Sequence, residues 1–399
     1  MDTLPRIPGH RLLHSPGPTH VPDEVLGAMH RQPMDLADPR VDATIEACEQ
    51  GLRWLAGAPD AAVFMYSANG HGAWEAAIEN LLPPGGTALV PGTGHFSDHW
   101  ALQVQALGRH ALRTPWLEGR PIDADAVEQA LRRDTAGEIA AVFVVHTDTA
   151  SGVTSDLDAL RAAIDAAGHP ALLVVDAVAS LGAAPLAMQA QRIDALVGAS
   201  QKGLMLPPGM GFVLAGARAR AAAQANPGKR FYWDWAQRDG GHSYRRFCGT
   251  PPLNLLFGLH ASLQLLQREG LPAVHRRHRV LAGAVQAAVQ GWSEGGRVGL
   301  FARDAASRSV SVTTVQVADG VDADAIRHTA RERFQVAIAG GLGPLTGRAF
   351  RIGHLGDLNA AMVLGCLAGV EATLTCLGVP VGPGTSRAIA ALARDDATT

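Results

Sequence analysis

The sequence predicts an α/β fold in which a mainly parallel sheet is covered by helices on both faces. Residues 139–145 and 171–175 are continuous apolar runs, which are typical of strands buried on both sides. Helical patterns of ten or more residues separate these and similar runs, as a parallel sheet requires. The 399 residues are enough for one large domain and a smaller one.

Each expected element has its own local signal. Residues 1–22 are rich in Pro, Gly and His, which predicts an irregular N-terminal arm. Apolar runs at 63–66, 87–90, 195–198 and 211–215 complete the predicted sheet. Helical patterns begin at residue 73 and cover residues 253–268. The stretch 216–250 contains charged, aromatic and glycine residues and is predicted to be a long loop region. Short strands such as 309–315 then alternate with helices, so we expect an arm over 1–22, a large domain over 23–270 and a small α+β domain over 271–399.

The composition excludes several classes of function. Hydrophobic residues make up 47% of the chain and charged residues 18%, as in ordinary soluble globular proteins. A net charge of -3 gives no footprint for nucleic acid, and the basic stretch 275–279 is predicted to be a solvated helix face. No signal peptide and no membrane-spanning stretch are expected. Four widely spaced cysteines fit reduced thiols, so we expect a cytoplasmic protein.

Two charged residues at strand ends are the most informative candidates. Lys202 follows the apolar run 195–198, and Asp176 ends the run 171–175. A desolvated lysine can lose its proton and form a Schiff base with pyridoxal phosphate, and a carboxylate can pair with the ring nitrogen of that cofactor. The alternatives are a solvated surface lysine and a helix-capping aspartate.

A glycine-containing turn follows another strand. Asn69, Gly70 and His71 precede a predicted helix, whose free N–H groups and dipole favour a phosphate. The alternative is a tight turn capped by Ser67 or Asn69, and the spacing fits neither a dinucleotide fingerprint nor a P-loop. Ligands of open α/β sheets bind beyond the carboxyl ends of the strands, where four such segments converge.

Aromatic, imidazole and guanidinium groups add to this picture. Phe96 can stack on a planar cofactor or serve as a core residue. His95 and His99 have the spacing of metal ligands, but no HExxH motif accompanies them, so we expect no metal. Arg351 lies in an apolar strand-like run, where it can clamp a carboxylate or form an internal salt bridge.

Taken together, these motifs resemble the class V, fold-type I aminotransferases, in particular the serine–glyoxylate and alanine–glyoxylate (serine–pyruvate) branches. The resemblance runs over nearly the whole chain. It is carried by Gly72-Ala73-Trp74-Glu75-Ala76-Ala77, Val175-Asp176-Ala177-Val178-Ala179-Ser180-Leu181, Ser200-Gln201-Lys202-Gly203-Leu204-Met205-Leu206-Pro207-Pro208-Gly209, Tyr232-Trp233-Asp234-Trp235 and Arg351-Ile352-Gly353-His354-Leu355-Gly356.

The resemblance implies a seven-stranded large domain, a homodimer with active sites at the subunit interface, and pyridoxal phosphate as cofactor. Small amino acids, serine or alanine, would donate to glyoxylate or pyruvate with ping-pong kinetics. Lys202 would hold the cofactor as an internal aldimine and move the proton. The implied contacts are Asp176 at the ring nitrogen, Val178 and Phe96 on the ring faces, Thr149 near the ring hydroxyl, Asn69, Gly70, His71 and Gln201 around the phosphate, Thr250 from the partner subunit, and Arg351 at the substrate carboxylate.

Some positions depart from the family pattern. Residues 34–39 stand where relatives often have Asp-His-Arg, close to the substrate, so the amino donor stays open. The other departures are Asn69 for serine or threonine, Asp148 for glutamate, Ala150 for serine, and Phe247 for a phosphate-binding tyrosine. The alternative functions are a lyase, a cysteine desulfurase using Cys248, a different amino donor, or a binding module that has kept the fold.

Overall fold

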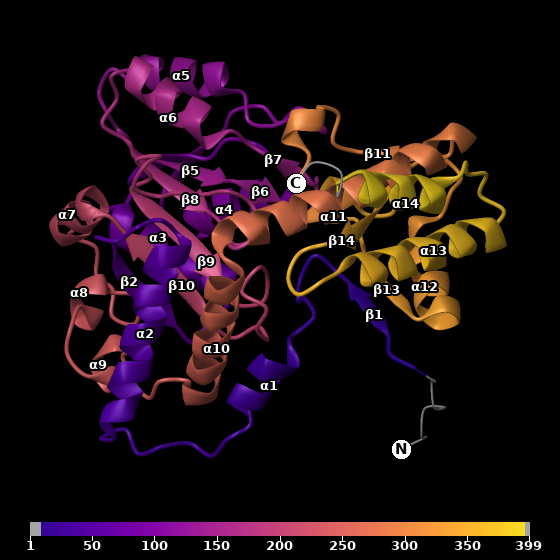
Figure 1. Cartoon of the computed structure of the whole chain (residues 1–399). Helices are drawn as coiled ribbons and strands as arrows, with labels where there is room; N and C mark the ends of the chain where they lie inside the picture. The colour runs from indigo at the N-terminus through magenta and orange to yellow at the C-terminus, as the bar shows by residue number, and fades with distance from the viewer. Residues whose placement is uncertain (1–8, 396–399) are drawn as a thin grey trace.

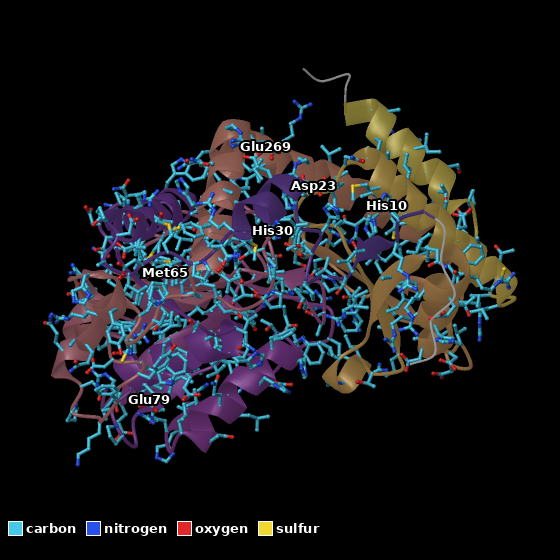
Figure 2. The ribbon with its side chains drawn as sticks, turned by 90° about the horizontal axis from the view of Figure 1, so that it is seen from below. His10, Asp23, His30, Met65, Glu79 and Glu269 are labelled. Carbon is cyan, nitrogen blue, oxygen red and sulfur yellow. The ribbon has the colours of Figure 1, made fainter. Side chains whose placement is uncertain are left out.

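The computed structural model describes residues 9–395, which form two large sheets, a two-stranded ribbon and the helices packed on them (Figure 1). Figure 2 shows the same arrangement from below, with Met65 and Glu79 in the larger part and His10 beside the smaller part. The helices are α1 (Asp23–Met29), α2 (Pro39–Leu55), α3 (Gly70–Leu81), α4 (His95–Ala106), α5 (Ala124–Arg133), α6 (Leu157–Ala166), α7 (Ala217–Ala225), α8 (Trp235–Arg238), α9 (Ser243–Arg246), α10 (Leu253–Glu269), α11 (Leu271–Trp292), α12 (Ala323–Phe334), α13 (Ala360–Cys376) and α14 (Gly384–Asp395).

The larger sheet has seven strands and confirms the predicted mainly parallel α/β architecture. Its order is β2 (Ala62–Tyr66), β10 (Gly211–Ala215), β9 (Ala195–Ala199), β8 (Leu172–Asp176), β5 (Ile139–Val145), β3 (Thr87–Leu89) and β4 (His110–Leu112). Strand β10 is the one strand of this sheet whose direction is opposite to that of the other six. The carboxyl ends of β5, β8 and β9 therefore meet at one edge.

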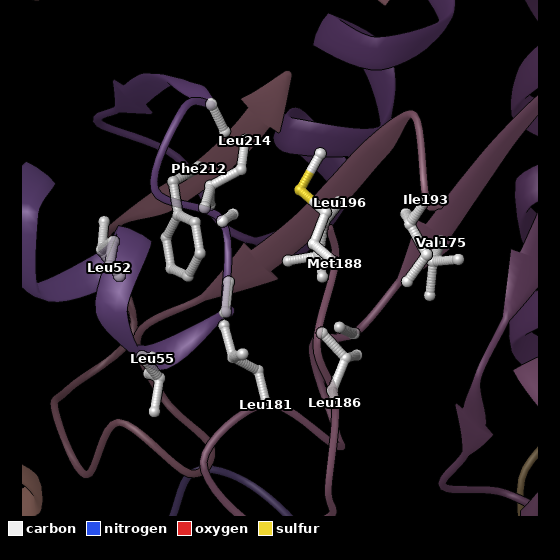
Figure 3. Packing of buried hydrophobic residues seen from close by; sticks show 14 of the residues in the cluster. Leu52, Leu55, Val175, Leu181, Leu186, Met188, Ile193, Leu196, Phe212 and Leu214 are labelled. Atoms are coloured by element: carbon white, nitrogen blue, oxygen red, sulfur yellow. The ribbon is translucent and has the colours of Figure 1, made fainter. Parts of the chain in front are cut away.

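Side chains of the central strands alternate between two apolar clusters, one on each face of the sheet. Leu173 and Val175 of β8 pack in the cluster that also takes residues from α2, α5, α6 and α10. Leu172 and Val174 pack in the cluster formed with α3, α4 and α7. Figure 3 shows part of the first cluster, in which Leu52 of α2 lies beside Phe212 of β10. This alternation explains why the strands read as continuous apolar runs.

A second sheet of five strands forms the core of the smaller part. Its order is β1 (Leu12–His14), β13 (Val336–Gly340), β14 (Ala349–Gly353), β12 (Val312–Val317) and β11 (Val298–Leu300). Strand β1 pairs in parallel with β13, so the arm between residues 12 and 14 belongs to this sheet. A strand of three residues before Pro16 is too short to give a periodic signal, which is why the arm was expected to be irregular. Strands β6 (Thr147–Asp148) and β7 (Val153–Thr154) form the ribbon.

The prediction of a long loop over 216–250 is wrong for part of that stretch. Residues Ala217–Ala225 form helix α7, because alanine, arginine and glutamine are strong helix formers. The short helices α8 and α9 follow. The edge strand β4 was also missed, since its outer residues His110 and Leu112 are exposed. Within residues 9–395, no helix combines the length and apolarity needed to cross a membrane.

Candidate active site

A pocket of about 250 Å³ lies at the edge where the carboxyl ends of the parallel strands meet. This volume is just below the usual range of about 300–1,000 Å³ for small-molecule sites. The predicted cofactor contacts that line it are Asn69, Gly70, His71, Phe96, Thr149, Asp176, Val178, Gln201 and Lys202. Sequence reasoning assigned no role to the other lining residues, which are Gly17, Pro18, Trp74, Thr147, Ala179 and Pro208.

Asp176 ends β8 and is 6% exposed. Its Oδ1 accepts a hydrogen bond of 2.7 Å from the Val178 N–H. Burial raises the pKa of the Asp176 carboxyl to about 7, although the Val178 bond and the charge of Lys202 act in the opposite direction. A carboxyl so far from its ordinary range gains most from a cationic partner in the pocket.

Lys202 lies in the turn after β9 and shows the opposite shift. Burial, followed by the charge of Arg351, lowers the pKa of its ammonium to about 8, while Asp176 and Asp148 act to raise it. The amine therefore loses its proton far more easily than a solvated lysine. Its Nζ donates a hydrogen bond to the carbonyl oxygen of Pro16, in the N-terminal arm.

The N-terminal arm approaches Lys202 through a glycine. A Cβ atom on Gly17 would lie 2.6 Å from Cδ, Cε and Nζ of Lys202, and the residue has φ +137°. Both the close contact and the backbone conformation therefore exclude a side chain at this position without rearrangement.

Helix α3 presents its N-terminus to the same pocket. Asn69 caps it, because its Oδ1 accepts hydrogen bonds from the His71 N–H at 3.1 Å and the Gly72 N–H at 3.3 Å. The capping interpretation of this turn is thus correct, and the helix dipole still favours an anion beside Gly70. A Cβ on Gly70 would lie 3.2 Å from Cγ2 of Val178, so glycine permits this close packing.

Asp148 connects several pocket segments, which sequence reasoning did not anticipate. Its Oδ2 accepts from the Phe96 N–H at 3.0 Å and from Thr93 Oγ1 at 3.3 Å, and its Oδ1 accepts from the Ala150 N–H at 2.9 Å. The side chain is completely buried, and this burial raises the pKa of its carboxyl. These bonds set the start of α4, and with it Phe96, against the segment that carries Thr149. The sequence signal that could have pointed to this role is the position of Asp148, an acidic residue soon after the buried strand β5.

Arg351 lies in the middle of β14 and is 7% exposed. Its Nε donates to the Gly340 carbonyl at 2.6 Å and its Nη1 donates to the Thr149 carbonyl at 3.0 Å. No ion pair joins Arg351 to an acidic side chain within residues 9–395. The alternative role of Arg351, an internal salt bridge, is therefore wrong. Burial lowers the pKa of the guanidinium to about 10, a value that still leaves it charged at neutral pH.

Five of the predicted or noted positions are not among the residues that line the pocket: Arg351, Thr250, Phe247, His95 and His99. Thr250 is exposed and Phe247 is buried in the core beside α10, and neither lines the pocket of its own chain. The rings of His95 and His99 are 4.0 Å apart between centroids. Among the residues that the structure describes, no group of three His, Cys, Asp or Glu side chains is arranged to hold a metal ion.

The residues of the pocket fit pyridoxal phosphate. They offer an amine with a lowered pKa, a buried carboxyl with a raised pKa, and a helix N-terminus on one small cavity. These are the groups that an aldehyde, a ring nitrogen and a phosphate respectively require. An aromatic ring, Phe96, lines the cavity as well.

Comparison with known proteins agrees with this geometry. Residues 11–346 match the family model described as "Aminotransferase class-V". The chain is 39% identical to a serine–glyoxylate aminotransferase of Methylorubrum extorquens, covering 96% of both chains, and 38% identical to an L-aspartate–glyoxylate aminotransferase of Paracoccus denitrificans, covering 94% of both. The crystal structure of ureidoglycine–glyoxylate aminotransferase from Bacillus subtilis superimposes with a TM-score of 0.87 at 26% identity, covering 99% of this chain and 100% of that one. The family implies pyridoxal phosphate as cofactor. The chain therefore belongs to the class V aminotransferase family.

Proposed function

We propose that this protein transfers the amino group of a small amino acid, serine or alanine, to glyoxylate or pyruvate, with pyridoxal phosphate held at Lys202. The single observation that carries the proposal is the pairing of Lys202 and Asp176 in one pocket, with the pKa of the amine lowered and that of the carboxyl raised. Glyoxylate is the acceptor named for both relatives described above, which supports it as the acceptor here.

The bound cofactor would supply an electron sink for the substrate's α-carbon. In this proposal Lys202 accepts and returns the proton at Nζ, since an amine with a pKa of about 8 exchanges protons readily near neutral pH. Asp176 holds a positive charge at the ring nitrogen, because its carboxyl is buried and needs a cationic partner. Arg351 holds the substrate carboxylate, since two of its nitrogens are already fixed by the carbonyls of Gly340 and Thr149.

The segment that departs from the family pattern bears on the identity of the amino donor. Residues 34–39, which depart from the family pattern, do not line the pocket of their own chain. Asp38 instead caps α2, accepting from the Arg40 N–H at 2.9 Å. In the homodimer that we propose, Thr250 and this segment would reach the partner's pocket. One relative, which is 38% identical to this chain, is an L-aspartate–glyoxylate aminotransferase. An acidic amino acid is therefore the second candidate donor.

A half-reaction screen tests the proposal. The enzyme loaded with pyridoxal phosphate is mixed with one amino acid at a time, without acceptor, and the released cofactor is assayed for conversion to pyridoxamine phosphate. We expect serine or alanine to convert it and glyoxylate to restore it. If both fail while aspartate succeeds, the donor assignment is wrong. If no amino acid converts the cofactor, the proposed transamination is wrong.

The same samples test the desulfurase alternative. Cys248 is partly buried and does not line the pocket, which disfavours it as a sulfur acceptor. With dithiothreitol added to reduce an enzyme persulfide, release of sulfide and alanine from cysteine, lost in Cys248→Ala, would favour that alternative over transamination.

A further inference from the structure

A second cavity, of about 480 Å³, lies at the other end of the large sheet. Asp194 and Gly216 line it, and these residues directly precede β9 and directly follow its antiparallel neighbour β10. Lys202 lies past the opposite end of β9. Five strand residues span roughly 16 Å, so the two cavities are separated by the length of the sheet.

The second cavity is lined by both basic and acidic side chains, with arginines in slight excess. Arg161, Arg192, Arg218 and Arg220 line it, together with three carboxylates. Two of those carboxylates are already engaged: Asp165 pairs with Arg161 at 2.7 Å and also with Arg192, and Asp194 pairs with Arg218 at 3.0 Å. The lining therefore carries one more positive than negative charge.

Arg161 is the most unusual member of this group. It extends from α6 and is only 6% exposed. Its Nε–H is buried and has no hydrogen-bond partner within the described part of the chain. A buried guanidinium N–H without an acceptor is costly, so an acceptor supplied by a ligand would relieve that cost.

Helix α7 begins at the same cavity with free donors. Gly216 at its N-cap offers no side-chain cap, and its first turn holds no acidic residue. The N–H groups of Ala217 and Arg218 have no hydrogen-bond acceptor among residues 9–395. Free N–H groups and the positive end of the helix dipole attract an anion.

Part of the lining of this cavity is apolar. Ala58, Ala61, Met188 and Ile193 line it, and Figure 3 shows Met188 and Ile193 close to the strands of the sheet. We propose that this cavity is a binding site for a small organic anion, whose carboxylate or phosphate head meets Arg161 and the start of α7 while its apolar body rests on Met188 and Ile193. This site is independent of the proposed transamination.

Titration calorimetry of the enzyme loaded with pyridoxal phosphate tests this site. The probes are inorganic phosphate, phenyl phosphate and benzoate. We expect phenyl phosphate to bind more tightly than inorganic phosphate, because only the former contacts the apolar part of the lining. The substitution Arg161→Gln should weaken the binding of phenyl phosphate roughly tenfold or more. If this variant does not fold, Arg220→Gln, at an exposed position, should weaken the binding to a similar extent. The matched control Arg279→Gln, an exposed arginine of α11, should bind as the unaltered protein does.

The comparison between probes identifies the head group that the site prefers. Tight binding of phenyl phosphate with weak binding of benzoate selects a phosphate head, and the reverse selects a carboxylate. Equal affinity of the unaltered protein, Arg161→Gln and Arg220→Gln would overturn the proposal, as would the absence of saturable binding by any probe. Loss of binding in Arg351→Lys, with no loss in Arg161→Gln, would place the anion at Lys202 and overturn it too.

Discussion

The Nη1 atom of Arg351 donates a hydrogen bond of 3.0 Å to the carbonyl oxygen of Thr149, 202 residues earlier in the chain. Arg351 belongs to β14 of the five-stranded sheet, whereas Thr149 lines the pocket at the end of the seven-stranded sheet. This bond ties the two sheets together at the site. Since Nε is held by Gly340, the guanidinium has a fixed orientation before any substrate binds.

Replacing Arg351 with lysine should raise the KM for amino acid substrates about tenfold, because a bidentate clamp becomes a point charge. The KM should rise for every substrate with an α-carboxylate. Steady-state kinetics measure it, with Arg348→Lys, an exposed position just before β14, as the matched control. Ethanolamine, which lacks the carboxylate, should react equally slowly with both variants. An unchanged KM for serine and alanine in Arg351→Lys would remove the role assigned to Arg351.

Asp176→Asn should stabilise the protein freed of cofactor, increasingly as the pH rises from 4 to 7. The folded pKa of about 7 lies above the ordinary value of 3.8, so the folded state binds more protons in this window. Stability of the unaltered protein therefore falls as pH rises through the window, and asparagine abolishes this contribution. The gain should be near zero at pH 4 and reach about 4 kcal/mol above pH 7. Urea unfolding at four pH values measures it, and a gain that does not depend on pH would contradict the assignment.

Gly17→Ala should disturb Lys202 without unfolding the protein. The added Cβ would lie 2.6 Å from the end of the lysine side chain, which must then move from its place beside Pro16. We expect the attachment of pyridoxal phosphate to Lys202 to slow about tenfold or more. The rate is measured by absorbance in the near-ultraviolet and visible range. In Gly27→Ala, the control, the new Cβ meets no atom within 4 Å and lies inside helix α1. Equal rates in both variants would show that the arm does not position Lys202.

Much of the large sheet could be predicted because its strands are buried on both faces. Residues 139–145 and 211–215 are strands with the predicted bounds, since an uninterrupted apolar run leaves little ambiguity. Strand β4 was missed because an edge strand with exposed His110 and Leu112 has no such run. Strand β1 gains its hydrogen bonds from β13, more than 300 residues away, and no local pattern reports that pairing.

The features of the pocket, too, could be predicted from the sequence only in part. The segments at the ends of β5, β8 and β9 could be brought together from the rule for parallel sheets. The contact between Lys202 and Pro16 could not, because it spans 186 residues and depends on how the arm crosses the pocket. The bonds of Asp148 to Phe96 and Ala150 were also beyond sequence reasoning, which noted Asp148 only as a departure from the family pattern.

Chemical trapping of the cofactor tests the central claim most directly. The chain contains two lysines, Lys202 and the exposed Lys229, so the second is an internal control. The protein is incubated with pyridoxal phosphate, reduced with borohydride, digested and analysed by mass spectrometry. We predict a pyridoxyl group on Lys202 at near-complete occupancy, little on Lys229, and none at residue 202 in Lys202→Ala. Equal labelling of both lysines, or labelling of Lys229 alone, would contradict the account.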